Sequence, residues 1–179
     1  MKPIFYCDCD GVILNTIEVA FSIMKENGCN ISDRKEVDNY FKRLIDWNEI
    51  FANASFINNS VEQIKNLKEQ DLFDDIVILT KLSGSVDEER LKRDLFKEVL
   101  PDVKVITLQY GLNKALVVPS KDNILLDDEI NNCKQWKKAN GIAILFSPYM
   151  NSYDANVISN IGDIANTKEV KKLIKTRKF

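Results

Sequence analysis

The chain of 179 residues is long enough for one domain of ordinary size with a small insertion. Its 25 basic and 27 acidic residues leave a net charge of only −2, which argues against a nucleic-acid binder or a protein held on anionic membranes. The absence of histidine excludes Ser-His-Asp and Cys-His triads, histidine-ligated zinc and histidine general bases. No apolar run approaches the roughly 18 residues of a membrane span, so we expect a cytoplasmic protein without a membrane partner.

The first predicted strand, residues 4–6, leads into the acidic turn Asp8-Cys9-Asp10-Gly11. Two carboxylates this close repel each other, and ionising both is costly unless a cation lies between them. Because ligands bind at the strand ends of open α/β sheets, the turn indicates a magnesium site; the alternative is an ordinary Asp-Gly surface turn. We interpret Cys7 and Cys9 as small packing residues, since no further cysteine pair or histidine completes a tetrahedral metal site.

The chain between the first strand and the next convincing one, residues 76–79, is predicted to be helical. It spans about seventy residues, whereas a whole βαβ unit takes about thirty. Capping residues predict a helix that ends near Asn27-Gly28, another that begins after Ser32 or Asp33 and a third that begins at Ser60.

The excess length predicts an insertion. We expect a core of residues 1–14 and 59–179, with residues 15–58 forming a small helical cap beside the strand ends. Four aromatic residues of the insertion are expected to form its own core rather than a substrate platform, although one of them could face the pocket. They are Phe41, Trp47, Phe51 and Phe56.

From residue 76 onward, strands alternate with helices, which predicts a parallel sheet and an α/β fold. Further strands are expected at 103–107, 123–126 and 142–146, and helices at 87–99, 112–118, 130–139 and 168–178. Leu91 and Leu95 are expected on the inner face of the 87–99 helix. The last helix is amphipathic and basic, and we interpret it as a surface helix rather than a nucleic-acid-binding arm.

Polar side chains able to handle a phosphate follow three of these strands, and the carboxyl ends of parallel strands lie along one edge of a sheet. The three groups are Asp8 with Asp10, Thr80 with Lys81, and Asp127 with Asp128. Lys114 lies on the short helix between two of these strands.

The order of these motifs along the chain resembles that of the haloacid dehalogenase-like (HAD) phosphohydrolases, and the resemblance covers nearly the whole sequence. It implies a Rossmann-like parallel sheet sandwiched by helices, with a small helical type-one cap. Residues 113–131 look most like the 5′(3′)-deoxyribonucleotidase branch. Lys81 stands where a serine usually follows Thr80, which bears on nucleotide specificity.

The resemblance implies an aspartyl-phosphate mechanism, with Asp8 as nucleophile and Asp10 as general acid and base. Mg²⁺ would be held by the Asp8 carboxylate, the main-chain carbonyl of Asp10 and the carboxylate of Asp128, with Asp127 in close support. The order of roles within the Asp127-Asp128 pair is left open.

The resemblance further implies that Thr80 and Lys114 bind the phosphate, and Lys81 is a candidate to contact the substrate. Two other lysines compete with Lys114 for its role. Lys121 is too near the start of a strand and hence the wrong sheet edge, and Lys104 lies in or beside a strand.

We therefore expect a magnesium-dependent phosphomonoester hydrolase acting on a small phosphorylated metabolite, with (deoxy)nucleoside monophosphates among the candidates. An acid at Asp10 favours a phosphatase over a dehalogenase. The alternatives are a 3′-phosphatase acting on nucleic-acid ends and a non-catalytic HAD-fold binding protein. A homodimer is left open.

Overall fold

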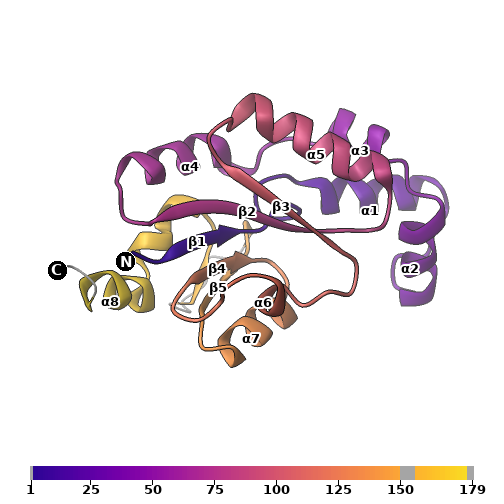
Figure 1. The fold of residues 1–179 in the computed structure, drawn as a ribbon. Helices are drawn as coiled ribbons and strands as arrows, with labels where there is room; N and C mark the ends of the chain where they lie inside the picture. Colours follow the sequence, from indigo (N-terminus) through magenta and orange to yellow (C-terminus); the bar gives the residue numbers. More distant parts are fainter. Residues whose placement is uncertain (1, 150–155, 177–179) are drawn as a thin grey trace.

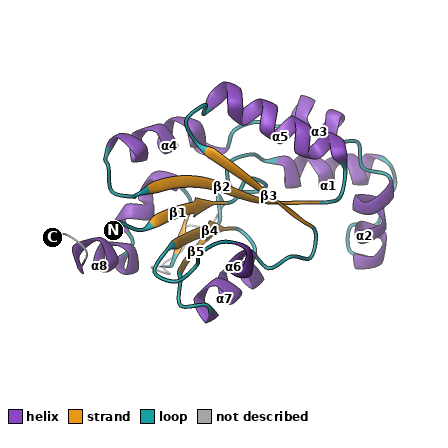
Figure 2. Ribbon diagram, in the orientation of Figure 1, coloured by secondary structure: helices purple, strands orange, loops and turns teal. Residues whose placement is uncertain are grey.

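The protein is described by a computed structural model of residues 2–149 and 156–176. These residues form a six-stranded parallel sheet with helices on both faces, so the expected α/β fold with a parallel sheet sandwiched by helices is confirmed (Figure 1, Figure 2). The strands are β1 Ile4–Cys7, β2 Asp75–Leu82, β3 Lys104–Gln109, β4 Ile124–Asp127, β5 Ile142–Phe146 and β6 Val157–Ile158.

The predicted helices are present, and the structure adds α3 and two 3₁₀ segments. The helices are α1 Thr16–Glu26, α2 Arg34–Arg43, α3 Trp47–Asn53, α4 Ser60–Glu69, α5 Val86–Val99, α6 Lys114–Val117, α7 Ile130–Lys138 and α8 Lys168–Thr176, with 3₁₀ segments η1 Ile57–Asn59 and η2 Ile161–Asn166. The last two residues of the predicted 168–178 helix lie outside the described residues. No helix in the described ranges has both the length and the apolar character that crossing a membrane requires.

Alternate strand residues point to opposite sides of the sheet, and both faces are buried because helices cover each of them. In β1, Phe5 packs into a core shared with α4, α5 and α8, whereas Tyr6 packs on the other side with Trp136 of α7. Cys7 and Cys9 are both buried in the first of these cores, as packing residues would be. The sheet is thus the middle layer of three, and side chains that could bind a ligand are expected at its edges rather than on its faces.

The strand order, β3-β2-β1-β4-β5-β6, places β1 at the topological switch point. The chain leaves β1 toward β2 and β3 on one side and later returns to β4, β5 and β6 on the other. Cys7, the last residue of β1, is in register with Ile78 of β2 and Leu126 of β4. Asp8 and Asp127 therefore emerge side by side at the carboxyl edge of the sheet.

Leu91 and Leu95 of α5 face inward as predicted, since each is half-buried and packs against a hydrophobic core. The most deeply buried stripe of the helix, however, is formed by Glu88, Lys92 and Phe96, spaced one turn apart. Hydrophobic periodicity does not reveal this stripe, because two of its members are charged residues whose burial depends on pairing.

The helices α1, α2 and α3 lie beyond the end of the sheet toward which β1 points (Figure 1). They share a hydrophobic cluster of their own, which includes Met24, Trp47 and Ile50. Two neighbouring chain segments join them to the sheet, paired by an antiparallel bridge between Leu14 and Phe56. The division into a 15–58 cap and a core remains a prediction.

Candidate active site

The turn after β1 brings two acidic segments into contact. Gly11 has a φ of +74°, a backbone conformation that favours glycine. A Cβ atom at this position would collide with the carboxylate of Asp128, which follows β4. Glycine thus favours both the turn and the close approach of the Asp128 carboxylate.

Three carboxylates gather at this point. Each of Asp8, Asp127 and Asp128 offers an oxygen, and these oxygens all lie within 4.8 Å of one another. Lys114 is the one cation paired with them among the described residues, with Nζ 2.8 Å from Asp8 Oδ2 and 2.7 Å from Asp127 Oδ2. With all three carboxylates ionised, the cluster carries two more negative than positive charges.

Asp127, the last residue of β4, and Asp128, which follows it, have different surroundings. Asp127 is fully buried, and its carboxylate accepts hydrogen bonds from Lys114, from the Asn132 amide at 3.0 Å and from the Glu129 main-chain N–H at 2.9 Å. By contrast, no side chain among the described residues donates a hydrogen bond to the Asp128 carboxylate, and Asp128 lines a pocket. Asp127 is committed to the protein, whereas Asp128 has free lone pairs.

The electrostatics reflect this crowding. Burial raises the pKa of Asp8 well above its usual value, and Asp127 and Asp128 raise it further against the opposing effect of Lys114. Asp128 as a whole residue is exposed, but its carboxylate packs against Gly11. The resulting loss of solvent around the carboxylate, together with the charge of Asp127, raises the pKa of Asp128 to about 7. Burial would lower the pKa of Lys114, but Asp8 and Asp127 outweigh it, so the ammonium group stays charged.

Asp10, two residues after Asp8, is held by donors from three elements. Thr16 of α1 donates to Oδ1 at 2.7 Å, while Thr80 of β2 and Lys92 of α5 contact Oδ2 at 3.2 and 2.5 Å. Thr80 is fully buried. Sequence reasoning missed Lys92, although the Glu88 to Lys92 spacing of four residues on a predicted helix is typical of a pair.

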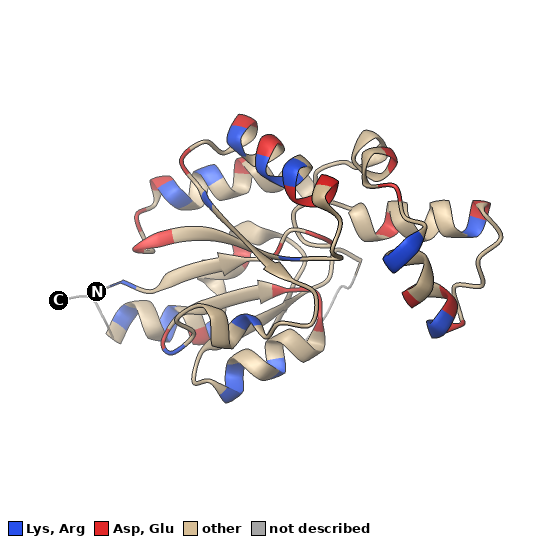
Figure 3. Ribbon diagram, turned by 45° about the vertical axis from the view of Figure 1, so that its right-hand side comes forward, with Lys and Arg blue, Asp and Glu red and all other residues tan. Residues whose placement is uncertain are grey.

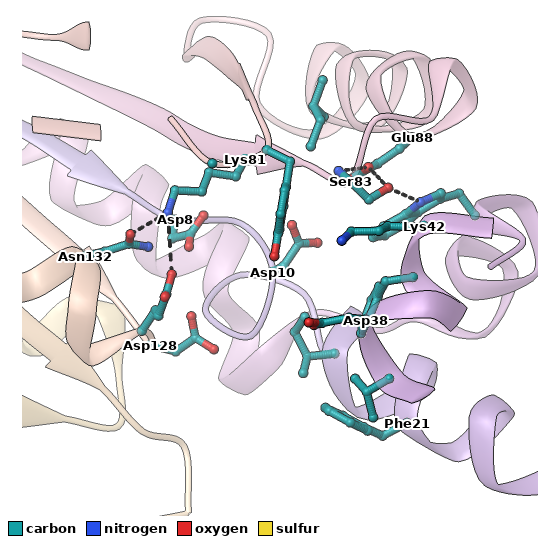
Figure 4. A pocket seen from close by; sticks show the side chains of 18 residues that line it. Asp8, Asp10, Phe21, Asp38, Lys42, Lys81, Ser83, Glu88, Asp128 and Asn132 are labelled. Atoms are coloured by element: carbon teal, nitrogen blue, oxygen red, sulfur yellow. Dashed lines mark hydrogen bonds and ion pairs between the residues drawn. The ribbon is translucent and has the colours of Figure 1, made fainter. Parts of the chain in front are cut away.

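The other candidate lysines are found in different places. Lys81 lies at the end of β2, with Nζ 2.6 Å from Asn132 Oδ1 and 3.5 Å from Glu129 Oε2 (Figure 4). Lys104 and Lys121 are both exposed, at the start of β3 and just before β4. These two lie at the amino ends of their strands, opposite the acidic cluster.

A pocket of about 650 Å³ opens between the acidic cluster and α1 and α2. Asp8, Asp10 and Asp128 form one wall (Figure 4). The opposite wall is largely apolar and has two charged residues, Asp38 and Lys42. Its apolar residues are Ile17, Phe21, Val37 and Phe41. The pocket thus joins an anionic end, suited to a metal ion, to an apolar chamber.

The predicted aromatic cluster is divided. Trp47 is buried, packs at 6.3 Å between ring centroids against Phe51 and also reaches the pocket wall. Phe41 lies edge-on to Phe21 at 6.4 Å, and both line the pocket. Phe56 lies apart, at the bridge to Leu14.

No family model matches the sequence, and neither does any curated protein. Solved structures do match. A HAD-superfamily hydrolase of subfamily IA from Geobacter sulfurreducens has a TM-score of 0.61 at 12% identity, over 93% of this chain and 99% of that one. The HAD-hydrolase YfnB from Bacillus subtilis, bound to magnesium, has a TM-score of 0.56 at 11% identity, over 92% and 97%.

A third match is CbbY from Rhodobacter sphaeroides, solved with xylulose-1,5-bisphosphate, with a TM-score of 0.55 at 13% identity over 93% and 99% of the two chains. Likeness at such identities establishes the fold: the chain has the architecture of the HAD hydrolases, with an acidic cluster at the switch point of its sheet. The similarity to the 5′(3′)-deoxyribonucleotidase branch stays a prediction.

Proposed function

We propose that the protein is a magnesium-dependent phosphomonoester hydrolase that works through an aspartyl-phosphate on Asp8. One observation carries the proposal: Asp8, Asp127 and Asp128 meet at the switch point, with Lys114 between two of them and Asp10 beside the same pocket. Structural similarity to HAD hydrolases, one bound to magnesium and one to a sugar bisphosphate, supports the same reaction class.

The residues suit Mg²⁺. Magnesium prefers oxygen ligands and is usually held by one or two carboxylates, and the cluster has an excess of two negative charges. The carboxylates of Asp8 and Asp128 and the main-chain carbonyl of Asp10 would hold it, with Asp127 fixed behind them by Lys114 and Asn132. When bound, the ion would offset the charge of the phosphate and of its attacker.

In the first step, a carboxylate oxygen of Asp8 attacks phosphorus, and the bond from phosphorus to the ester oxygen breaks. Asp10 gives its proton to the departing alkoxide. The main-chain N–H of Cys9 donates to Asp8 Oδ1 at 2.7 Å and Lys114 contacts Oδ2, so the nucleophile is oriented before substrate binds.

In the second step, Asp10, now ionised, takes a proton from a water molecule that attacks phosphorus. The bond between phosphorus and the Asp8 oxygen breaks, and inorganic phosphate leaves. The Lys114 ammonium would stabilise the negative charge on the phosphoryl oxygens in both steps, and Lys81 would contribute a further donor, whereas the buried Thr80 hydroxyl donates to Asp10.

The substrate would be a small phosphomonoester whose alcohol portion occupies the apolar chamber, and nucleoside monophosphates are of suitable size and chemistry. Residues 15–58 would act as the cap over it. A nucleic-acid end is less suitable, because the pocket wall has six acidic residues and two lysines, and acidic residues stand at the ends of the central strands (Figure 3). A non-catalytic binding protein would not need Asp10.

The test is a panel of phosphate esters assayed with MgCl₂ and with EDTA, using the wild-type chain and Asp8→Asn. The wild-type chain is expected to be active with MgCl₂ and inactive with EDTA. Asp8→Asn should abolish the activity and leave the far-ultraviolet circular dichroism spectrum unchanged. Substantial turnover by Asp8→Asn would show that the nucleophile is another residue. A wild-type chain that neither binds magnesium at millimolar concentrations nor cleaves any ester would point to the non-catalytic alternative.

A further inference from the structure

A second buried lysine serves Asp10 in the way that Lys114 serves Asp8. The side chain of Lys92 is fully buried, with Nζ 2.5 Å from Asp10 Oδ2 and 2.7 Å from Glu88 Oε1. An ammonium group is buried at this depth only when it is paired. Burial lowers its pKa, but Asp10, Cys9 and Glu88 outweigh that effect, so Lys92 remains a cation.

The direction of the Lys92 ammonium group is fixed independently of Asp10. Glu88 lies one turn earlier on α5, and the main-chain carbonyl of Lys81 accepts from Nζ at 3.2 Å. The remaining direction leads to Asp10 and to the Thr80 hydroxyl at 3.1 Å. A rigid cation is therefore presented to one oxygen of the Asp10 carboxylate.

Glu88 is itself anchored. Its Oε2 accepts hydrogen bonds from the main-chain N–H and the hydroxyl of Ser83, at 2.6 and 2.7 Å. The same hydroxyl accepts from the indole N–H of Trp47 at 2.9 Å, and the Trp47 ring lies 5.3 Å from Lys92 Nζ. A continuous chain of polar contacts thus runs from α3 of the insertion to Asp10.

We propose that Lys92 is a positioning residue: backed by Glu88, it holds the Asp10 carboxylate where that group exchanges a proton with the leaving oxygen and the attacking water. The inference rests on the proposed function, in which Asp10 is the acid and base. Lys92 transfers no proton itself. Its contribution is the orientation of Asp10, since proton transfer requires hydrogen-bond reach of the reacting oxygen.

Leaving groups of different basicity distinguish this role from a merely structural one. The nitrophenolate of p-nitrophenyl phosphate departs without a proton, whereas the phenolate of phenyl phosphate needs one far more. In Lys92→Met, kcat/KM for phenyl phosphate should fall by about 10- to 100-fold, as when a partner that orients a functional ligand is removed. For p-nitrophenyl phosphate it should fall by less than about threefold, and Asp10→Asn should show the same selectivity more strongly.

The control is Lys97→Met, which removes an exposed lysine from the same helix and should leave both esters unchanged. An equal loss for the two esters, in a Lys92→Met protein that still binds magnesium in calorimetry, would overturn the proposal. Glu88→Gln leaves Lys92 beside Asp10 but points an amide NH2 group at either Lys92 or the two Ser83 donors. It therefore loosens the support of Lys92 and provides a second test if Lys92→Met does not fold. A loss confined to phenyl phosphate in Glu88→Gln supports the proposal, and unchanged kinetics contradict it.

Failure of the proposed function would look different. If the wild type cleaves neither ester, or if Asp8→Asn is as active as the wild type, the hydrolase assignment fails before the role of Lys92 is reached. If Asp8→Asn is inactive and Lys92→Met loses activity equally on both esters, the hydrolase stands and only the positioning role is wrong.

Discussion

Removal of the Lys114 ammonium group should destabilise the protein strongly, because two buried carboxylates depend on it. Its side chain is 1% exposed, and it lies within 2.8 Å of both Asp8 and Asp127. Neither aspartate has another cation at ion-pair distance within the described residues. Removal of one partner from a buried ion pair costs about 3–5 kcal/mol, out of a typical total of roughly 5–15 kcal/mol. We expect Lys114→Met to lose about 3–5 kcal/mol.

The assay is urea unfolding in EDTA at pH 8. Lys121→Met is the control, since that lysine is exposed, and it should change stability by less than about 0.5 kcal/mol. Magnesium at a hundred times its dissociation constant should restore about 2.7 kcal/mol to either chain that still binds it. A loss below about 1 kcal/mol in Lys114→Met would refute the reasoning that Lys114 neutralises this cluster.

Gly11→Ala should lose magnesium affinity and about 1–2 kcal/mol of stability, whereas Gly28→Ala, with a similar φ of +76° but open space around it, should lose stability alone; titration calorimetry and urea unfolding check both. Magnesium affinity should weaken as the pH falls below about 7, because burial raises the pKa of Asp128 to about 7 and that of Asp8 above its usual value, and a ligand must be ionised to bind. Without metal the sign reverses: these carboxyls bind protons more tightly in the folded than in the unfolded chain, so stability in EDTA should fall as the pH rises from about 4 to about 7, and a rise would contradict the raised pKa values. Phe41→Ala, which removes a ring from the pocket wall, should raise KM for nucleoside monophosphates about tenfold and for β-glycerophosphate far less, as steady-state kinetics would show.

The ends of the strands can be predicted well from the sequence, because a buried parallel strand is a short apolar run and a polar residue marks its end. Asp8, directly after β1, and Asp127, at the end of β4, could be located in this way, and parallel pairing then brings them to one edge. The order of roles within the Asp127-Asp128 pair could not be read locally. It depends on which carboxylate Lys114 and Asn132 contact, and both lie elsewhere in the chain.

Lys92 illustrates what the pattern hides. A charged residue on a helix is usually assigned to solvent, and only tertiary pairing with Asp10 and Glu88 makes its burial favourable. Similarly, β6 has just two residues, too few for any periodicity, and it exists because β5 offers it an edge at Leu145 and Phe146. In both cases the determining contacts are long-range.

The most direct test of the account is a crystal structure of the protein grown with MgCl₂ and beryllium trifluoride, a mimic of a phosphoryl group on a carboxylate. The account predicts beryllium bonded to a carboxylate oxygen of Asp8 and one magnesium ion about 2.0–2.1 Å from oxygens of Asp8 and Asp128. An unmodified Asp8, with magnesium bound elsewhere or with the two carboxylates turned away from a common ion, would contradict it.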